Sequence, residues 1–317
     1  MSNTRKYYVG IDLGGTFIKG GIVEDGGNIL VDEKIPTGSE GGAVDVAKNI
    51  ASLFSSLLNK LNLTKRDVIG IGIGVPGIID SKSGEVIYSC NLGWENFRIG
   101  EAVESLTGLS VKITNDANAA ALGEAKFGCG KNYSSTVLIT LGTGVGSGIV
   151  IDGKLFEGNK SAGAEFGHSV ICAGGEVCTC GRRGCFEAYA SATALIRDTK
   201  RAMQKHPESK MWDGGDIDTV DGKRAFDYLD TDEAAKEVVK NYTDMIGVGL
   251  VNIANTFRPE AIILGGGICA EGERLTRPLV EFMNREIYAS DKSPEVKILI
   301  ASLGNKAGIL GAAALLM

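Results

Sequence analysis

The stretch Val9-Gly-Ile-Asp-Leu-Gly-Gly-Thr16 places a glycine-rich turn between apolar runs, and glycine and valine residues continue the pattern after it. A similar stretch, Leu138-Ile-Thr-Leu-Gly-Thr-Gly-Val-Gly146, follows about 130 residues later. Each predicts a strand, a Gly/Thr turn, a second strand, another turn and a third strand. Backbone N–H groups and a hydroxyl in such a turn can bind phosphate oxygens. Either copy alone would also fit an ordinary hairpin. Two copies with matched flanks predict a duplicated domain whose turns face one ligand.

Strands and helices alternate along the rest of the chain. Apolar residues at helical spacing predict helices over 44–63, 117–127, 234–257 and 307–316, and short apolar runs predict strands over 68–75, 111–114, 261–264 and 296–301. The helix over 234–257 should end before Pro259, because a residue that precedes proline disfavours the helical conformation. This pattern predicts an α/β fold of two similar domains. We expect residues 1–116 plus 302–317 in the N-terminal domain and 117–301 in the C-terminal domain. The Asp-rich segment 205–232 lacks calcium-loop spacing and is expected to be a solvated loop.

A cysteine-rich segment offers the ligands of a metal site. His168, Cys178, Cys180 and Cys185 have the spacing H-x9-C-x-C-x4-C. Three thiolates and one imidazole suit a closed tetrahedral zinc site. Such a site would bring Glu165, His168 and Glu187 together in one polar pocket of the C-terminal domain. A disulfide or a merely cysteine-rich turn is the alternative, and Cys172 is a spare candidate ligand.

Composition narrows the class of protein. The chain has 317 residues, a net charge of −6 and seven cysteines, an odd number that fits no even disulfide framework. Thiols used as metal ligands imply a reducing compartment, so we expect a cytoplasmic protein. The N-terminal segment does not resemble a signal peptide. No apolar run reaches the roughly 18 residues of a membrane span, so no membrane partner is expected. Without a basic block, nucleic acid is not an expected partner.

Two aspartates are candidates for chemistry. Asp116 stands where a strand ends and a helix begins, which is the usual place for active sites in α/β folds. There a carboxylate can accept a proton from an attacking hydroxyl, or Asn115 or Asp116 can simply cap the helix. Asp12 can end a strand or hold the Mg²⁺ of a nucleotide through water. The Gly/Thr turns, which can bind phosphate, favour the general-base interpretation of Asp116 and the Mg²⁺-binding interpretation of Asp12.

Seven motifs follow one another along the chain. They are Asp12-x-Gly-Gly-Thr16, Gly74-Val-Pro-Gly77, Asn115-Asp116-Ala-Asn-Ala-Ala, Leu141-Gly-Thr-Gly-Val-Gly146, Glu165-x-Gly-His168, Cys178-x-Cys180-Gly-x-x-Gly-Cys185-x-Glu187 and Leu264-Gly-Gly-Gly267. In this order they resemble the ROK family (repressor, open reading frame, kinase) over essentially the whole chain. They are most similar to its bacterial glucokinases. The zinc motif with its glutamates is the most specific part. The resemblance implies the two-domain ribonuclease-H-like fold of actin and hexokinases, with an interdomain cleft that closes on sugar.

The resemblance also implies roles for single residues. Asp116 matches the general base that accepts the proton of the 6-hydroxyl of glucose. The implied sugar-binding residues are Gly77, Asn115, Asp116, Glu165, His168 and Glu187. The implied ATP-binding residues are Asp12, Gly14, Gly15, Thr16, Gly142, Thr143, Gly144, Gly265, Gly266 and Gly267. The implied metal ligands are His168, Cys178, Cys180 and Cys185. The expected cofactors are therefore ATP, Mg²⁺ and a structural Zn²⁺.

Other functions within the family stay open at this stage. N-acetylmannosamine or another hexose is an alternative substrate, and polyphosphate is an alternative donor. A sugar-sensing regulator is the alternative to an enzyme, because the family includes repressors with an additional N-terminal DNA-binding domain. The first strand is expected at about Tyr7, which leaves no room for such a domain. Trp94 fits the glucokinase branch, or it is an ordinary packing aromatic. We expect a homo-oligomer, either a dimer or a tetramer.

Overall fold

The computed structural model describes residues 6–317, and the chain divides into two compact units. The first unit consists of the described residues up to Leu138, Gly148–Ala164 and Ala301–Met317, and the second of Ile139–Ser147 and Glu165–Ile300. This division differs from the predicted boundary after residue 116. The helix α3 (Asp116–Phe127) stays with the first unit because it packs against α9 (Ala307–Ala314). The expected return of the C-terminal residues to the first unit agrees with the division.

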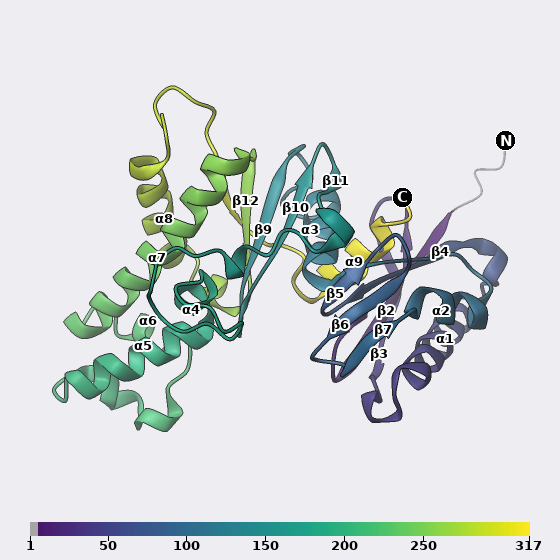
Figure 1. Ribbon diagram of the computed structural model, residues 1–317, viewed down its shortest axis with the longest axis horizontal. Coiled ribbons are helices and arrows are strands. Elements are labelled where there is room, and N and C mark those ends of the chain that lie inside the picture. Colours follow the sequence, from purple (N-terminus) through teal and green to yellow (C-terminus); the bar gives the residue numbers. More distant parts are fainter. Residues whose placement is uncertain (1–5) are drawn as a thin grey trace. The chain divides into compact units, whose positions relative to one another are not determined.

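The first unit is built on a five-stranded sheet in the order β3-β2-β1-β4-β8 (Figure 1). Its strands are β1 (Tyr7–Leu13), β2 (Phe17–Glu24), β3 (Ile29–Pro36), β4 (Val68–Val75) and β8 (Val111–Asn115). The first three strands pair antiparallel, whereas β1, β4 and β8 are parallel. The carboxyl ends of β1, β4 and β8 therefore lie at one edge, where Asp12 and Asn115 are found.

Alternation along β1 shows how both faces of this sheet are covered. Val9, Ile11 and Leu13 belong to a core cluster that includes buried residues of α1 (Ala43–Lys60), such as Leu53. Tyr8, directly before Val9, belongs to a separate cluster with residues of α9. Successive side chains of a strand point to opposite faces. The helices α1 and α9 therefore cover opposite faces of the sheet, and α2 (Ile99–Thr107) packs beside α1 (Figure 1).

A small antiparallel sheet of β5 (Ile78–Asp80), β6 (Glu85–Ser89) and β7 (Trp94–Phe97) completes the first unit. Trp94 is only 4% exposed and contacts the ring of Phe97 edge-on, with 5.3 Å between ring centroids. Trp94 is therefore a packing residue of the interior.

The second five-stranded sheet has the order β11-β10-β9-β12-β13. Its strands are β9 (Thr136–Leu141), β10 (Val145–Ile151), β11 (Lys154–Leu155), β12 (Ala261–Gly265) and β13 (Lys297–Ile300). This order repeats that of the first sheet, with β9 in the place of β1 and β12 in the place of β4. The duplication predicted from the two Gly/Thr stretches is confirmed.

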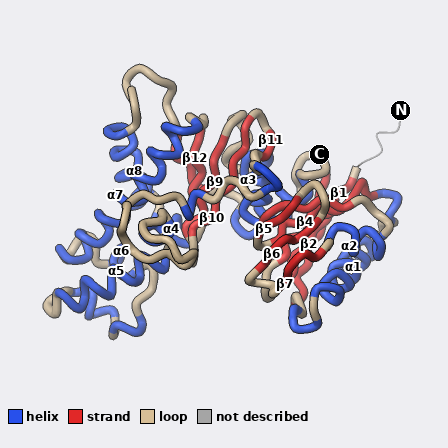
Figure 2. Tube along the Cα trace, viewed as in Figure 1, coloured by secondary structure: helices blue, strands red, loops and turns tan. Residues whose placement is uncertain are grey.

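Helices make up most of the second unit (Figure 2). They are α4 (Glu187–Ala190), α5 (Ala192–Lys205), α6 (Arg224–Asp227), α7 (Glu233–Phe257) and α8 (Glu273–Glu286). The solvated loop expected over 205–232 is wrong. This segment contains α6 and two short 3₁₀ helices, and Phe226 is completely buried. Arg224 is 7% exposed and organises the segment by donating to the carbonyl groups of Met211, Gly215 and Thr219.

Over residues 6–317, none of the helices combines the length and the apolar character that crossing a membrane requires.

Candidate functional site

At the junction of β8 and α3, one residue caps the helix and the next residue has an exposed carboxylate. The side-chain oxygen of Asn115 accepts the backbone N–H groups of Ala117 and Asn118, at 2.8 and 3.4 Å. Asn115 therefore caps α3, as its sequence position allows. Its Nδ2 donates to the carbonyl oxygen of Gly77 at 2.9 Å, and its side chain also forms a hydrogen bond to the carboxylate of Asp116. Asp116 follows as the first helical residue, and its exposed carboxylate accepts the N–H of Ala117 at 2.9 Å.

Electrostatics distinguish Asp116 from an ordinary surface aspartate. Its side chain is accessible to solvent, yet the protein atoms around the carboxyl group partly desolvate it, and this raises its pKa. The negative charge of Asp12 raises the pKa further, whereas the hydrogen bonds from Ala117 and Asn115 lower it. Asp12 itself pairs with Lys19, whose Nζ lies 3.1 Å from Oδ2. A carboxylate whose pKa is raised binds a proton more readily, which suits a general base.

The first Gly/Thr turn, Gly14–Thr16, joins β1 to β2 in the same unit. The N–H of Gly14 donates to the carbonyl of Phe17 at 2.9 Å, which closes the turn. Thr37 holds it from the outside, since its hydroxyl donates to the Gly14 carbonyl at 2.7 Å and its N–H to the Thr16 carbonyl at 2.9 Å. The exposed side of the turn presents Thr16 to solvent. No local pattern indicates a role for Thr37, which lies 23 residues from Gly14.

The second Gly/Thr turn, Gly142–Gly144, lies against Glu187. The N–H of Val145 donates to Oε2 of Glu187 at 3.0 Å. A Cβ atom placed on Gly144 would lie 2.4 Å from the same oxygen. A phosphate-type turn and a candidate sugar ligand are therefore in direct contact within the second unit.

The third glycine run, Gly265–Gly267, is next to this turn. It follows β12, and a Cβ atom on Gly266 would lie 2.2 Å from the carbonyl oxygen of Leu141. Leu141 directly precedes Gly142. The structure thus brings together two of the predicted nucleotide-binding segments, which are more than 120 residues apart in the chain.

The four predicted metal ligands form one cluster. One ligand atom from each of His168, Cys178, Cys180 and Cys185 lies within 4.8 Å of the others. The Cys180 and Cys185 sulfurs are 3.7 Å apart, and Nδ1 of His168 is 3.6 Å from the Cys178 sulfur. Zinc bond lengths place two sulfurs of a tetrahedral site about 3.8 Å apart, and a sulfur and a nitrogen about 3.6 Å apart. The donor set and these separations fit zinc.

The backbone around the cluster explains its shape. Gly184 has φ +84°, which residues with a Cβ atom rarely adopt, and a Cβ atom there would lie 1.7 Å from the carbonyl oxygen of Cys172. The N–H of Cys178 donates to the carbonyl of Arg182 at 2.8 Å, which closes the turn between the ligands. All seven cysteines are free, so the predicted alternative of a disulfide is not what the structure contains. Cys172 is exposed and lies outside the group of four ligand atoms.

The cluster is linked to Glu187 by short contacts. Oε1 of Glu187 accepts the Thr179 hydroxyl at 2.7 Å and lies 3.7 Å from the Cys178 sulfur. Glu187 therefore connects the cysteine cluster to the second Gly/Thr turn. Thr179 is a residue that sequence reasoning missed, although it stands between two metal ligands.

Glu165 directly precedes a single 3₁₀ turn, Phe166–His168, that ends with His168 and packs on β10. The N–H of Phe166 donates to the Ser147 hydroxyl at 3.0 Å, and the N–H of His168 to the Glu165 carbonyl at 3.1 Å. The ring of Phe166 meets that of Phe257 edge-on, at 5.6 Å between centroids. Glu165 is exposed, so its carboxylate is accessible to a ligand.

The predicted residues thus gather into two groups. Gly77, Asn115, Asp116, Asp12 and the turn Gly14–Thr16 belong to the first unit. Glu165, His168, Glu187, the three cysteines, the turn Gly142–Gly144 and the run Gly265–Gly267 belong to the second.

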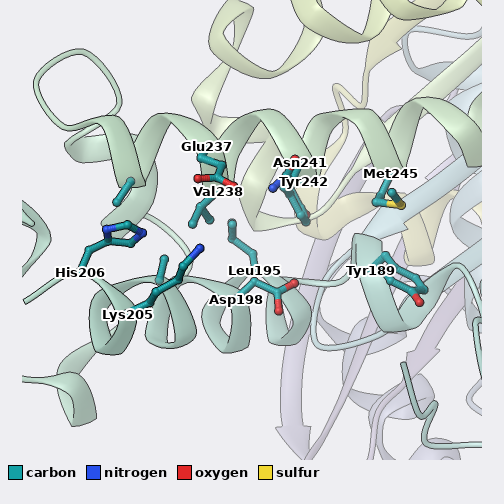
Figure 3. A pocket seen from close by; sticks show the side chains of 12 residues that line it. Tyr189, Leu195, Asp198, Lys205, His206, Glu237, Val238, Asn241, Tyr242 and Met245 are labelled. Carbon is teal, nitrogen blue, oxygen red and sulfur yellow. The ribbon is translucent and has the colours of Figure 1, made fainter. Parts of the chain in front are cut away.

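A groove of about 330 Å³ between α5 and α7 contains none of these residues. Figure 3 shows Leu195, Val238 and Tyr242 along its length, with Lys205 and Glu237 among the polar side chains. The hydroxyl of Tyr242 is already used, because it donates to the carbonyl of Ala190 at 2.8 Å. The groove is therefore separate from the predicted site.

Comparison with known proteins identifies the family and the fold of the chain. The model of the ROK family matches residues 8–317. The glucokinase of Halalkalibacterium halodurans is 37% identical over 310 residues, which cover 96% of this chain and 93% of that protein. The crystal structure of a ROK family glucokinase from Streptomyces griseus in complex with glucose and AMPPNP is 35% identical, with a TM-score of 0.78 and 98% of both chains covered. The ROK hexokinase from Thermus thermophilus is 33% identical, with a TM-score of 0.83 and 97% of both chains covered.

This chain belongs to the ROK family. The predicted two-domain α/β fold, of the actin and hexokinase type, is confirmed by these structural neighbours.

Proposed function

We propose that this protein is an ATP-dependent hexose kinase that phosphorylates glucose at its 6-hydroxyl, with Asp116 as the general base. The observation that carries the proposal is that Asn115 and Asp116 have different roles at the end of β8. Asn115 satisfies the N–H groups that begin α3, so Asp116 is left with an accessible carboxylate of raised pKa. Relatives named glucokinase, at 35–37% identity over nearly the whole chain, support the substrate and the donor.

Asp116 accepts the proton of the attacking hydroxyl. A positioned base of this kind typically contributes about 100- to 10,000-fold to the rate. The raised pKa increases the affinity of the carboxylate for that proton. When bound, MgATP supplies the phosphoryl group and a cation that neutralises its charge. Asp12, at the end of β1, is the residue we assign to the Mg²⁺ through water.

The glycine segments bind the nucleotide. Gly14–Thr16 and Gly142–Gly144 offer backbone N–H groups and hydroxyls to phosphate oxygens, as turns of this kind do. Gly265–Gly267 borders the second turn and is assigned to the adenosine side.

Glucose specificity comes from polar groups that must be paired when the sugar is bound. Glu165, His168 and Glu187 form hydrogen bonds with its hydroxyls, Asn115 contacts it through its side-chain amide, and Gly77 forms part of the wall. A sugar that leaves such groups unpaired loses their hydrogen bonds, which can reduce catalytic efficiency by orders of magnitude.

The zinc ion, held by His168, Cys178, Cys180 and Cys185, has a structural role. Four protein ligands leave no open coordination position for Lewis-acid chemistry. Through Thr179, which stands between two of these ligands, the cluster fixes the carboxylate of Glu187, so metal binding and sugar binding depend on each other.

A coupled kinase assay tests the function directly. Catalytic efficiency is compared for glucose, mannose, fructose, N-acetylglucosamine and N-acetylmannosamine, with ATP and with polyphosphate as donors. We expect glucose with ATP to give the highest value. A clear preference for fructose or an N-acetylated sugar would contradict the glucokinase assignment and leave the hexose kinase assignment intact. Binding of a sugar without any phosphorylation would favour a sugar-sensing regulator.

We further propose that the protein acts in the cytoplasm, in glycolysis, as a dimer or tetramer. Free thiols that serve as metal ligands need a reducing compartment, which supports the location. Light scattering of the purified protein tests the oligomeric state.

A further inference from the structure

A hydrogen-bond network in the first unit centres on Glu157, which belongs to none of the motifs above. The hydroxyl of Thr114 donates to Oε1 of Glu157 at 2.7 Å, and that of Ser81 donates to Oε2 at 2.8 Å. The hydroxyl oxygens of Ser81 and Ser161 are 2.8 Å apart, and the N–H of Ser81 donates to the Ser161 oxygen at 3.3 Å. One carboxylate therefore connects three segments of the chain.

The chemistry of the groups sets the direction of every bond. An ionised carboxylate only accepts hydrogen bonds, so the hydroxyl hydrogens of Thr114 and Ser81 both point to Glu157. Ser81 has then used its only hydroxyl hydrogen, and Ser161 must be the donor between the two serines. Hydrogen bonds that run one way into a charged acceptor strengthen one another.

The three connected segments all lead to predicted sugar ligands. Thr114 is completely buried and directly precedes Asn115 and Asp116. Ser81 follows β5, the short strand that begins just after Gly77. Glu157 begins the segment 157–164, after which the chain leaves the first unit and continues with Glu165.

The segment that Glu157 begins has an unfavourable backbone. Lys160, Ser161 and Ala164 have φ values of +49°, +54° and +66°. Residues with a Cβ atom rarely adopt this left-handed region, and such conformations persist only where surrounding contacts impose them. The bonds from Ser161 to Ser81, and from Ser81 to Glu157, are contacts of this kind.

We propose that Glu157 is a positioning residue of the sugar site. It keeps Thr114 in place beside Asn115 and Asp116, and it keeps the strained segment 157–164 in the one conformation that leads into Glu165. The inference rests on the proposed function. Glu157 acts through these neighbours and contacts neither sugar nor nucleotide.

Loss of the hydrogen bonds to Glu157 should change the kinetics in a particular way. When only a fraction of the molecules has the binding-competent conformation, the apparent dissociation constant rises by the inverse of that fraction. Glu157→Ala removes two hydrogen bonds to a charged group, and we expect this to leave about one tenth of the molecules in the competent conformation. Bound glucose restores the conformation, so the chemical step itself is unchanged.

The test compares Glu157→Ala, Glu157→Gln and Ser81→Ala with the wild type. Asn159→Ala is the matched control, because Asn159 is exposed in the same segment and its side chain is outside the network. Glucose affinity is measured by calorimetry without nucleotide, and kcat, KM for glucose and KM for ATP by the coupled assay. Thermal unfolding reports whether each variant is folded.

For Glu157→Ala we expect the Kd and KM for glucose to rise about tenfold, while kcat and KM for ATP stay within twofold. Glu157→Gln should lie between this variant and the wild type, because its amide oxygen can still accept one hydroxyl. Ser81→Ala removes one of the two donors and should raise the Kd by about threefold. Asn159→Ala should match the wild type.

A folded Glu157→Ala that binds glucose as tightly as the wild type overturns the proposal, and so does a fall in kcat with unchanged KM. If Glu157→Ala does not fold, the Kd of Ser81→Ala for glucose is the test, and a value equal to that of the wild type overturns the proposal. If the wild type binds glucose without phosphorylating it, the proposed function is disproved. The positioning role of Glu157 is then still tested by the Kd measurements. A wild type that neither binds nor phosphorylates a sugar disproves both.

Discussion

Replacing Gly144 by alanine should weaken glucose binding through Glu187. The new Cβ atom would lie 2.4 Å from Oε2 of Glu187, about 1 Å closer than an ordinary van der Waals contact. The backbone φ of Gly144 is not in the left-handed region, so alanine causes no backbone strain of its own. The end of a glutamate side chain can move, whereas the turn is held at both ends. The carboxylate must therefore shift and release the N–H of Val145, which it now accepts at 3.0 Å.

The size of the effect follows from that bond. A hydrogen bond to a charged group contributes about 1.5–3 kcal/mol. Since about 1.4 kcal/mol corresponds to a tenfold change in affinity, the Kd for glucose should rise about 10- to 100-fold.

Calorimetry with glucose alone measures this effect without any contribution from nucleotide binding. Gly142→Ala is the matched control for the turn, because a Cβ atom there would meet only the carbonyl oxygen of Gly144, at 3.9 Å. It should leave the Kd for glucose unchanged. Equal Kd values for Gly144→Ala and the wild type would refute the assignment of Glu187 as a sugar ligand fixed by this turn. Equal losses in both variants would mean that the turn as a whole, and not Glu187, is responsible.

Three further predictions concern Asp116 and the metal cluster. Asp116→Asn should lower kcat by about 100- to 10,000-fold and still bind glucose. Its melting temperature at pH 7 should not fall. The pKa of Asp116 is higher in the folded than in the unfolded protein, so ionised Asp116 reduces stability as pH rises through these two values. Near-normal turnover of the variant would show that Asp116 is not the base. For the wild type, kcat/KM should fall as pH falls through the raised pKa of Asp116, and Asp12→Asn should move this limb to lower pH by removing a charge that raises the pKa. An unchanged limb would contradict the coupling. Cys180→Ser should lose its zinc and its affinity for glucose, whereas Cys172→Ser should keep both. Elemental analysis measures the zinc content, and calorimetry measures glucose binding. Active protein without zinc would contradict the structural role of the metal.

Short-range patterns in the sequence were enough for the main outline. The paired Gly/Thr stretches predict a duplicated domain, because strand, turn and strand follow from apolar runs and glycines close together in the chain, and the two sheets have the same strand order. The four candidate metal ligands are predictable for the same reason. His168 and the three cysteines lie within 18 residues, and only zinc-type chemistry needs that donor set.

Local patterns could not assign the junction of β8 and α3, where Asn115 and Asp116 were equally good caps. The structure decides for Asn115, since its amide also bonds to the carbonyl of Gly77, a partner 38 residues away. The segment 205–232 was misjudged because its many aspartates suggested solvent. Its fold depends on one buried arginine, Arg224, whose partners are backbone carbonyls that have no sequence signature.

Residue types along the chain define which side chains are available for chemistry, and the packing of the folded chain brings particular ones into contact. Glu187 is joined to Val145 across 42 residues, and Glu157 to Ser81 across 76. Such contacts depend on how the sheets and loops pack, and a glutamate in a loop looks the same in the sequence whether or not it has these partners. The physical reason is that residue type and spacing govern local backbone geometry, whereas the hydrogen bonds that position a site are made between segments that only the folded chain brings together.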